Sequence, residues 1–251
     1  MKYLTFNIRY DCRRDGINNF DLRKPLILRT LEEEKPDVIG FQEVLPHVAR
    51  YLRDTLTDYS FAGCPRDENL QGEQVCVAWR RHTVNLLEMR TLWLSPAPFT
   101  PGSRYPDQSD CPRTATFALL EDVAQGKVFR VVNTHLDHVG QESRTLALRQ
   151  IFEELERPCL FPEAPLILGG DFNAEPDSPE MQILYREKGL QVLTDHLGMT
   201  YHGFGGPHTS LIDYICIRGS IAAGDVRKWD RAEEGVYLSD HYPISADLTL
   251  L

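Results

Sequence analysis

The sequence has no apolar run close to the length that crosses a membrane, and it has no excess of positive charge. A membrane-spanning helix needs about 20 consecutive apolar residues, and no stretch of this chain approaches that length. The 251 residues include 27 Lys and Arg against 37 Asp and Glu, which gives a net charge of −10. An acidic surface repels duplex DNA and anionic lipids. We therefore expect no membrane association and no strong binding to duplex DNA.

Paired cysteines are also absent. The six cysteines are scattered along the chain, and none forms a Cys-x-x-Cys pair. A chain of this length buries enough surface to fold without disulfides, so we expect reduced, mostly buried thiols. The N-terminal segment MKYLTFNIRY has no apolar signal region. We predict a cytoplasmic protein and favour a monomer.

Repeats of fixed period and low-complexity tracts are missing as well. The hydrophobic fraction of 42% and the charged fraction of 25% are typical of a soluble globular protein. The segment 95–112 is rich in Pro and Gly, but the pattern after it continues as before. We therefore interpret this segment as a loop inserted in one domain that covers residues 1–251.

Short apolar strands alternate with helical patterns along the chain. In the clearest helix, within 141–157, apolar residues recur at i, i+3, i+4 and i+7. The last strand alternates apolar and polar residues strictly, which indicates one packed and one polar face. The expected helices are 22–35, 46–56, 141–157 and 179–188, and the expected strands are 3–7, 38–41, 74–79, 83–94, 114–120, 128–133, 166–168, 211–217 and 244–250. This order favours an α/β (α+β) protein with two packed sheets and helices outside.

Polar residues follow several of these apolar strands. The set comprises Asn7, Glu43, His135, Asp137, Asp171, Asn173, Asp213, Asp240 and His241. Active sites are commonly built from strand ends and the loops that follow them. Carboxylate and amide oxygens suit Mg²⁺ or Mn²⁺ better than Zn²⁺, and histidines supply proton transfer. These residue types together are what in-line attack on a phosphoester requires.

Six segments in order resemble the motifs of the endonuclease/exonuclease/phosphatase superfamily. This superfamily includes deoxyribonuclease I, apurinic/apyrimidinic endonucleases, neutral sphingomyelinases, inositol polyphosphate 5-phosphatases and the nocturnin-like deadenylases. The resemblance implies a four-layer αββα sandwich and hydrolysis of phosphoesters with a divalent metal. The segments are TFN (5–7), GFQE (40–43), NTHLDH (133–138), GGDFNAEPD (169–177), IDYI (212–215) and SDHYP (239–243).

The resemblance implies a site for Mg²⁺ or Mn²⁺. Glu43 would be the main ligand, with Asn7 beside it. Asp240 would complete the metal site or support it from behind.

The resemblance also implies the catalytic residues. Asp171 and Asn173 would position or activate the attacking water and hold the phosphate, which His135 would also contact. His241, paired with Asp213, would act as an acid or base or stabilise the transition state. Whether Asp171 or His241 takes the proton from water stays open at this point.

Further residues near these motifs are candidates for substrate binding. The NTHLDH segment is most similar to the nocturnin and deadenylase branch and its bacterial relatives. Arg9 stands two residues after Asn7 and suggests a cation that binds phosphate, as do Arg113 and Arg144 near the motif strands. An ordinary ion pair is the alternative for each arginine. The remaining candidates are Asp137, His138 and His202, the histidines having a solvated or core role as the alternative.

Two other families share part of the pattern. NTHLDH differs from the zinc motif of metallo-β-lactamases by having Asn133 in place of the first histidine, which leaves a poor zinc site. Calcineurin-like phosphoesterases share GD-x-x-[DN], but their GNH[DE] motif is missing here. A phosphate-binding GxxxxGK[ST] loop is missing too.

We expect a compact pocket with the metal site at its floor and with loops 11–20, 95–112 and 201–208 at its rim. The predicted substrate is a small phosphorylated metabolite, a nucleotide or a short nucleic-acid end. One alternative is a 3′–5′ exoribonuclease similar to the deadenylases. A second is a non-catalytic module that binds metal. The sequence leaves open whether a monoester or a diester is cleaved.

Overall fold

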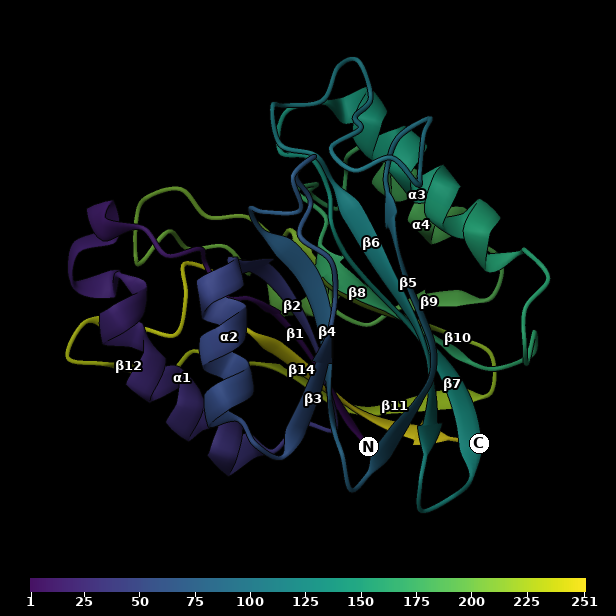
Figure 1. Cartoon of the computed structure of the whole chain (residues 1–251), viewed down its shortest axis with the longest axis horizontal. Helices are drawn as coiled ribbons and strands as arrows, with labels where there is room; N and C mark the ends of the chain where they lie inside the picture. The colour runs from purple at the N-terminus through teal and green to yellow at the C-terminus, as the bar shows by residue number, and fades with distance from the viewer.

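Two mixed β-sheets pack face to face, with helices on their outer surfaces, in the computed structural model of residues 1–251 (Figure 1). The first sheet has the strand order β11-β14-β1-β2-β4-β3, and the second has the order β5-β6-β7-β8-β10-β9. This arrangement confirms the predicted four-layer αββα sandwich.

The strands of the first sheet come from both ends of the chain. They are β1 (Lys2–Asn7), β2 (Val38–Val44), β3 (Tyr59–Ala62), β4 (Gln74–Arg80), β11 (Ile221–Lys228) and β14 (Ile244–Leu250). Those of the second sheet are β5 (Val84–Trp93), β6 (Thr114–Asp122), β7 (Lys127–His135), β8 (Leu166–Asp171), β9 (Leu190–Val192) and β10 (Asp213–Arg218). A small hairpin of β12 (Ala232–Glu233) and β13 (Val236–Tyr237) lies apart from them.

Each sheet is covered by its own helices. The first sheet is covered by α1 (Phe20–Glu34) and α2 (Pro46–Thr55), and the second by α3 (Gln141–Leu155) and α4 (Met181–Arg186). Two short 3₁₀ helices, η1 (Arg13–Asn18) and η2 (Asp195–Leu197), complete the chain. No helix has the length and apolar character needed to span a membrane.

The buried side chains form three clusters, one for each interface between neighbouring layers. Leu26, Ile27 and Leu52 pack helices on the first sheet, while Leu148 and Ile151 pack α3 on the second. Tyr3, Val77, Ile167, Ile215 and Ile244 belong to the cluster between the sheets. The periodicity at 148–155 thus marks the inward face of α3, as the sequence predicts.

Close approach of the sheets requires glycine at two positions. A Cβ atom on Gly40 in β2 would lie 2.9 Å from the Asn133 side chain of the second sheet, and one on Gly169 in β8 would lie 2.6 Å from the Tyr3 hydroxyl of the first sheet. Beside them, the buried Asn133 amide donates to the carbonyl oxygens of Phe41 and Cys76 at 2.8 and 2.9 Å. Asn133 therefore joins the two sheets.

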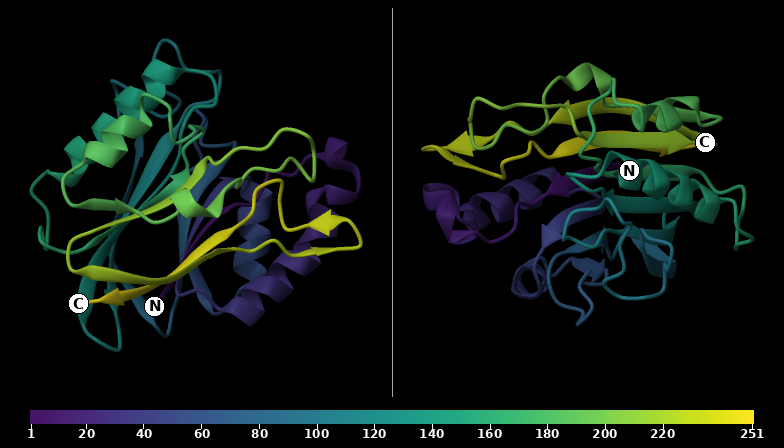
Figure 2. Two further views of the ribbon diagram at one scale, coloured as in Figure 1. Left: turned by 180° about the vertical axis from the view of Figure 1, so that it is seen from behind. Right: turned by 90° about the horizontal axis from the view of Figure 1, so that it is seen from above.

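Both termini lie near each other (Figure 2), where the Met1 amino group donates to the Leu248 carbonyl at 2.8 Å. This end of the sheets is opposite to the end where β1 finishes and β14 begins. The opposite end holds the polar residues that follow the strands.

Several expectations need correction. Only Cys76 and Cys216 are buried, because the other four thiols lie in loops, although all six are free. Ser245 in β14 is buried rather than on a polar face, because its hydroxyl accepts a hydrogen bond from the Trp229 indole at 2.9 Å. The strand β11 escapes prediction because IAAGDVRK contains a bulge between Ala223 and Val226 that disrupts its alternation.

Candidate active site

The register of the strands brings the predicted residues to one edge of the sandwich. Asn7 at the end of β1 lies opposite Gln42 of the parallel strand β2. In the second sheet, Asp171 lies opposite both His135 of the parallel strand β7 and Asp213 of the antiparallel strand β10. Since β1 faces β8 and β2 faces β7, the two sets of side chains meet between the sheets.

A cleft of about 680 Å³ opens at this edge. It contains most of the predicted catalytic and metal-binding residues, namely Glu43, His135, Asp171, Asn173, Asp240 and His241. Asn7 and Asp213 lie directly behind them, in contact with Asp171 and His241. The structure thus brings together all eight residues that the sequence assigns to metal binding and catalysis.

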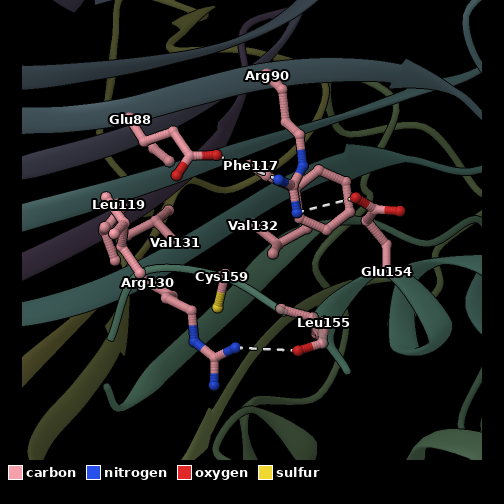
Figure 3. A pocket seen from close by; sticks show the side chains of 12 residues that line it. Glu88, Arg90, Phe117, Leu119, Arg130, Val131, Val132, Glu154, Leu155 and Cys159 are labelled. Carbon is pink, nitrogen blue, oxygen red and sulfur yellow. Dashed lines mark hydrogen bonds and ion pairs between the residues drawn. The ribbon is translucent and has the colours of Figure 1, made fainter. Parts of the chain in front are cut away.

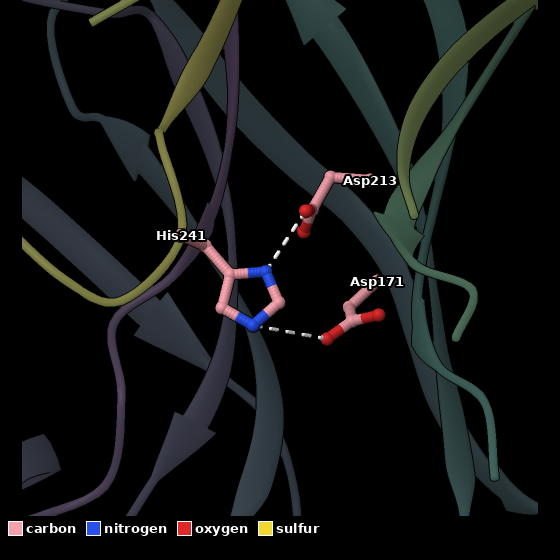
Figure 4. Close-up of side chains that lie close together, drawn as sticks. All are labelled: Asp171, Asp213 and His241. Atoms are coloured by element: carbon pink, nitrogen blue, oxygen red, sulfur yellow. Dashed lines mark hydrogen bonds and ion pairs between the residues drawn. The ribbon is translucent and has the colours of Figure 1, made fainter. Parts of the chain in front are cut away.

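His241 stands between two buried carboxylates (Figure 4). Its Nδ1 lies 2.8 Å from Asp213 Oδ2, and its Nε2 lies 3.7 Å from Asp171 Oδ2. Burial lowers the pKa of His241, but the charges of Asp213 and Asp171 outweigh this and hold its pKa well above the ordinary value. The two carboxylates therefore favour the protonated form of the ring.

His135 has the opposite character. Its Nε2 lies 3.5 Å from Asp171 Oδ2, yet burial and the nearby Arg113 hold its pKa well below the ordinary value. The surroundings of the two rings therefore shift their pKa values in opposite directions. Titratable groups that are driven apart in this way are typical of acid–base chemistry.

Asp171 is the central carboxylate. The Asn7 amide donates to its Oδ2 at 3.0 Å, and the Asn173 backbone N–H donates to its Oδ1 at 2.9 Å. Burial and the neighbouring Asp213 raise its pKa to about 7. A carboxylate with such a pKa can accept and release a proton near neutral pH.

Three residues of the site have a left-handed backbone conformation. Arg9, Glu43 and Asn173 have φ of 58°, 61° and 48°, a region that costs non-glycine residues roughly 1–2 kcal/mol. At Glu43, the register between β2 and β4 also shifts. Strain of this kind often occurs at functional sites, and here it lies where each chain segment leaves its strand.

The oxygen donors of the cleft fit a hard divalent cation. Glu43 Oε1 accepts from the Asn7 amide at 3.0 Å, and Glu43 Oε2 accepts from the Tyr10 backbone N–H at 2.9 Å. Burial and the nearby Glu43 raise the pKa of Asp240, as burial does for Asp171. A cation would offset this crowding of buried negative charge, and oxygen ligands suit Mg²⁺ or Mn²⁺.

A second set of possible metal ligands lies beside Glu43 and Asp240. Ligand atoms of Asp171, Asp213 and His241 all lie within 4.8 Å of one another, a spacing that could hold a metal. In this structure the imidazole itself bridges the two carboxylates (Figure 4). Asn7, Glu43 and Asp240 are therefore the better candidates for metal ligands.

Three of the predicted substrate-binding residues line the cleft: Arg9, Arg113 and His138. Arg9 pairs with Asp15 at 3.0 Å and lies 3.6 Å from Asp240. Arg113 donates to His138 Nδ1 at 2.9 Å. Both arginines therefore line the cleft and are at the same time paired with neighbouring side chains.

The other three predicted substrate-binding residues lie outside the cleft and stabilise nearby loops. They are Asp137, Arg144 and His202. Arg144 pairs with Glu180 and donates to the Asp137 carbonyl at 2.9 Å. The Asp137 carboxylate accepts backbone N–H groups of 109, 139 and 140. His202 is buried and stacks on Tyr242 with ring centres 4.0 Å apart. The structure gives these residues contacts that stabilise loops, in line with the ion-pair and core alternatives.

The expected rim is partly wrong. The segment 11–20 contributes nothing to the cleft, because η1 packs on α1 and Asn18 hydrogen-bonds Tyr237. Only Cys111 comes from 95–112, and only Tyr201 from 201–208. Arg66 and Glu73 line the cleft instead, paired at 2.9 Å. The segment 63–73 carries no strand-end signal, so the sequence offers no means of finding them.

A smaller cavity lies on the outer face of the second sheet (Figure 3). Its charged residues are already paired: Arg90 lies 2.9 Å from Glu154, and Arg130 donates to the Leu155 carbonyl at 3.1 Å. It shares no lining residue with the cleft. We therefore place the chemistry in the cleft.

The sequence matches the model of the Endonuclease/Exonuclease/phosphatase family over residues 4–241. The chain belongs to this family. Members of the family hydrolyse phosphoester bonds, and this chain is accordingly a phosphoester hydrolase. The match confirms the resemblance on which the site assignment rests.

Solved structures of the family have the same fold. The endonuclease/exonuclease/phosphatase from Bacteroides vulgatus is 30% identical, with a TM-score of 0.93 over 100% of this chain and 98% of that chain. The mannosyl-6-phosphatase Bt3783 of Bacteroides thetaiotaomicron is 21% identical, with a TM-score of 0.89 over 99% of both chains. The human Nocturnin catalytic domain is 18% identical, with a TM-score of 0.73 over 100% of this chain and 93% of that chain. No curated protein sequence is significantly similar to this chain.

Proposed function

We propose that this protein is a phosphoesterase that depends on Mg²⁺ or Mn²⁺ and acts on a small phosphorylated metabolite. One observation carries the proposal. The carboxylates Glu43 and Asp240 and the acid–base pair His241 and Asp171 line a single cleft, with Asn7 directly behind Glu43. Attack of water on phosphorus needs these two sets of groups together.

The size and charge of the site favour a small substrate. A cleft of about 680 Å³ lies within the range of about 300–1,000 Å³ that is typical of small-molecule sites. The net charge of −10 opposes a long polyanion, which would need a continuous basic groove. The mannosyl-6-phosphatase with the same fold is in keeping with this substrate class.

Glu43, Asn7 and Asp240 would hold the metal. When bound, a divalent ion offsets the negative charge on the phosphoryl oxygens. The Arg9 guanidinium, 3.6 Å from Asp240, would keep that carboxylate oriented toward the cleft.

His241 and Asp171 would perform the proton chemistry. Asp213 raises the pKa of His241 and fixes the orientation of its ring, so that Nε2–H would donate to a phosphoryl oxygen as negative charge develops there. Asp171, with its pKa raised to about 7, would accept the proton of the attacking water. His135 is neutral and would donate a hydrogen bond to the phosphate.

The test is phosphate release from sugar phosphates, nucleoside monophosphates and short oligoadenylate, with Mg²⁺, Mn²⁺ or a chelator. We expect metal-dependent release from a small compound, and a loss of at least 10²-fold in Asp171→Asn, as is typical of a general base. The exposed Asp225 provides the matched control, Asp225→Asn. Preference for oligoadenylate would favour the exoribonuclease alternative, and release that survives both chelation and Asp171→Asn would refute the proposal.

A further inference from the structure

Two arginines and a histidine gather at one end of the cleft, where β4 and β6 begin. Arg113 directly precedes β6, and Arg66 is held there by Glu73, which directly precedes β4. His138 stands beyond the end of β7. Since β4 packs against β6, the three side chains line the same wall of the cleft, which we call the arginine wall.

Arg113 is buried with a free donor. It is only 4% exposed, its Nη2 donates to His138 Nδ1 at 2.9 Å, and its Nε lies 3.4 Å from Asp137 Oδ1. Its Nη1 is buried without any partner. A buried guanidinium N–H that lacks an acceptor destabilises the protein, so an oxygen acceptor from a ligand would be favoured here.

Arg66 repeats this pattern. Its Nη1 pairs with Glu73 at 2.9 Å, while its Nε is buried and has no partner. Both arginines therefore line the cleft, and each holds one buried N–H donor without a partner. A guanidinium matches the oxygens of a phosphate better than any other side chain does.

His138 adds a third donor. Because a guanidinium can only donate, the hydrogen bond from Arg113 requires His138 Nδ1 to be an acceptor. The ring is then the neutral tautomer that carries its proton on Nε2. His138 therefore offers an N–H to the same cleft.

We propose that the arginine wall binds the terminal oxygens of a phosphomonoester dianion, so that the enzyme is a phosphomonoesterase rather than a phosphodiesterase. This inference rests on the proposed function. Water attacks phosphorus, the bond from phosphorus to the alcohol oxygen breaks, and the products are the alcohol and inorganic phosphate. The monoester has three terminal oxygens, which suffice for both the metal side of the cleft and the arginine wall.

A phosphodiester is expected to bind the arginine wall poorly. It carries one charge instead of about two, and an ester group replaces one terminal oxygen. A buried donor that faces an ester group loses its charge-assisted hydrogen bond. Sites of this kind reject the analogue that leaves their buried polar groups unpaired.

The test compares p-nitrophenyl phosphate with bis(p-nitrophenyl) phosphate at pH 8 in Mg²⁺. The wild type should have the higher kcat/KM for the monoester. Arg113→Lys should lower that value by about 100-fold, as the loss of one oxyanion donor does, while it changes the diester rate little. Arg66→Gln should act in the same direction. The control is Arg218→Lys, an arginine that is also paired with glutamates, 187 and 156, but lies away from the cleft.

Binding provides a readout that needs no turnover. Calorimetric titration with inorganic phosphate should give weaker binding for Arg113→Lys than for Arg218→Lys, and dimethyl phosphate should bind both variants equally weakly. Circular dichroism confirms that the variants are folded.

Each outcome decides the matter. Higher kcat/KM for the diester, or equal losses for both esters in Arg113→Lys, would overturn the monoester assignment and leave the phosphoesterase standing. If neither ester reacts, the phosphate titration decides: weaker binding in Arg113→Lys supports the arginine wall, and identical binding in Arg113→Lys and Arg218→Lys refutes it.

Discussion

Arg23 is a fully buried arginine whose guanidinium donates to backbone carbonyls rather than to a carboxylate. Its partners are the carbonyl oxygens of Ile8, Arg9 and Leu238 at 2.6, 2.9 and 2.8 Å, and that of Asn18 at 2.7 Å. Burial lowers its pKa to about 10, which still leaves it charged. Arg23 thus ties the segment that follows the proposed metal ligand Asn7 to the segment before β14, which contains the proposed ligand Asp240.

We predict that Arg23→Met lowers the free energy of unfolding by about 3–5 kcal/mol, because it leaves four buried carbonyls unpaired. Arg23→Lys, which retains the charge and some of the bonds, should fold and lose kcat more than it raises KM. Urea denaturation and steady-state kinetics measure these effects. A variant Arg23→Lys with wild-type kcat and wild-type Mg²⁺ requirement would contradict a positioning role.

Asp213 acts through His241. Its carboxylate lies 2.8 Å from His241 Nδ1 and is the main cause of the raised pKa of that ring. We predict that Asp213→Asn lowers kcat by about 10²–10⁴-fold with little change in KM, since the amide neither charges nor orients the ring in the same way. An unchanged kcat would refute the pairing.

At the scale of elements, Asp137 joins the loop after β7 to the loop before β6. Burial opposes its ionised form, but hydrogen bonds from Gly140 and Ser109 outweigh burial and lower its pKa to about 2. A carboxyl whose pKa falls on folding stabilises the fold above its unfolded pKa, and this stabilisation is lost as the pH falls toward the folded value. Asp137 therefore contributes at neutral pH.

We predict that Asp137→Asn reduces the free energy of unfolding by about 2 kcal/mol at pH 7, which follows from the fall of the pKa from 3.8 to about 2. The difference from wild type should shrink as the pH falls from about 4 to 2. Urea denaturation at several pH values tests this, with Asp225→Asn as the control. A difference that does not depend on pH would show that the charge is irrelevant.

Strand ends could be predicted from the sequence, and loops could not. Asn7, His135 and Asp171 follow apolar strands directly, so the hydrophobic pattern fixes where they lie. Arg66 and Glu73 reach the cleft through the loop between β3 and β4, whose path depends on contacts far away in the sequence. The same limit explains why Arg144, near the motif in sequence, lies outside the cleft: it turns toward Glu180 of a distant segment.

At the scale of the whole molecule, the fit between the two sheets positions the two halves of the site. Tyr3 is fully buried between them, and its hydroxyl has no partner. A Cβ on Gly169 would lie 2.6 Å from that hydroxyl. Gly169 precedes Asp171 by two residues in β8, so any shift there moves the site.

We predict that Gly169→Ala lowers the free energy of unfolding by about 1–3 kcal/mol through overpacking. Tyr3→Phe alone should be neutral or stabilising, because it removes a buried unpaired hydroxyl. The double variant should recover only part of the loss, because the hydroxyl is gone but the ring carbons Cε1 and Cζ of residue 3 still lie 2.9 and 3.1 Å from the added methyl group. Thermal and urea denaturation of the three variants measure this coupling, and simple additivity would contradict the proposed contact.

Residues from both sheets form one hydrolytic centre in the proposed function. The most direct test is kcat/KM for p-nitrophenyl phosphate in Mg²⁺, measured for His241→Asn from the first-sheet side, Asp171→Asn from the second, and the double variant. Residues that act as a unit give strongly non-additive losses. We predict that each single variant loses about 10³-fold and that the double variant loses hardly more. Near-wild-type activity in either single variant, or fully additive losses, would contradict the claim.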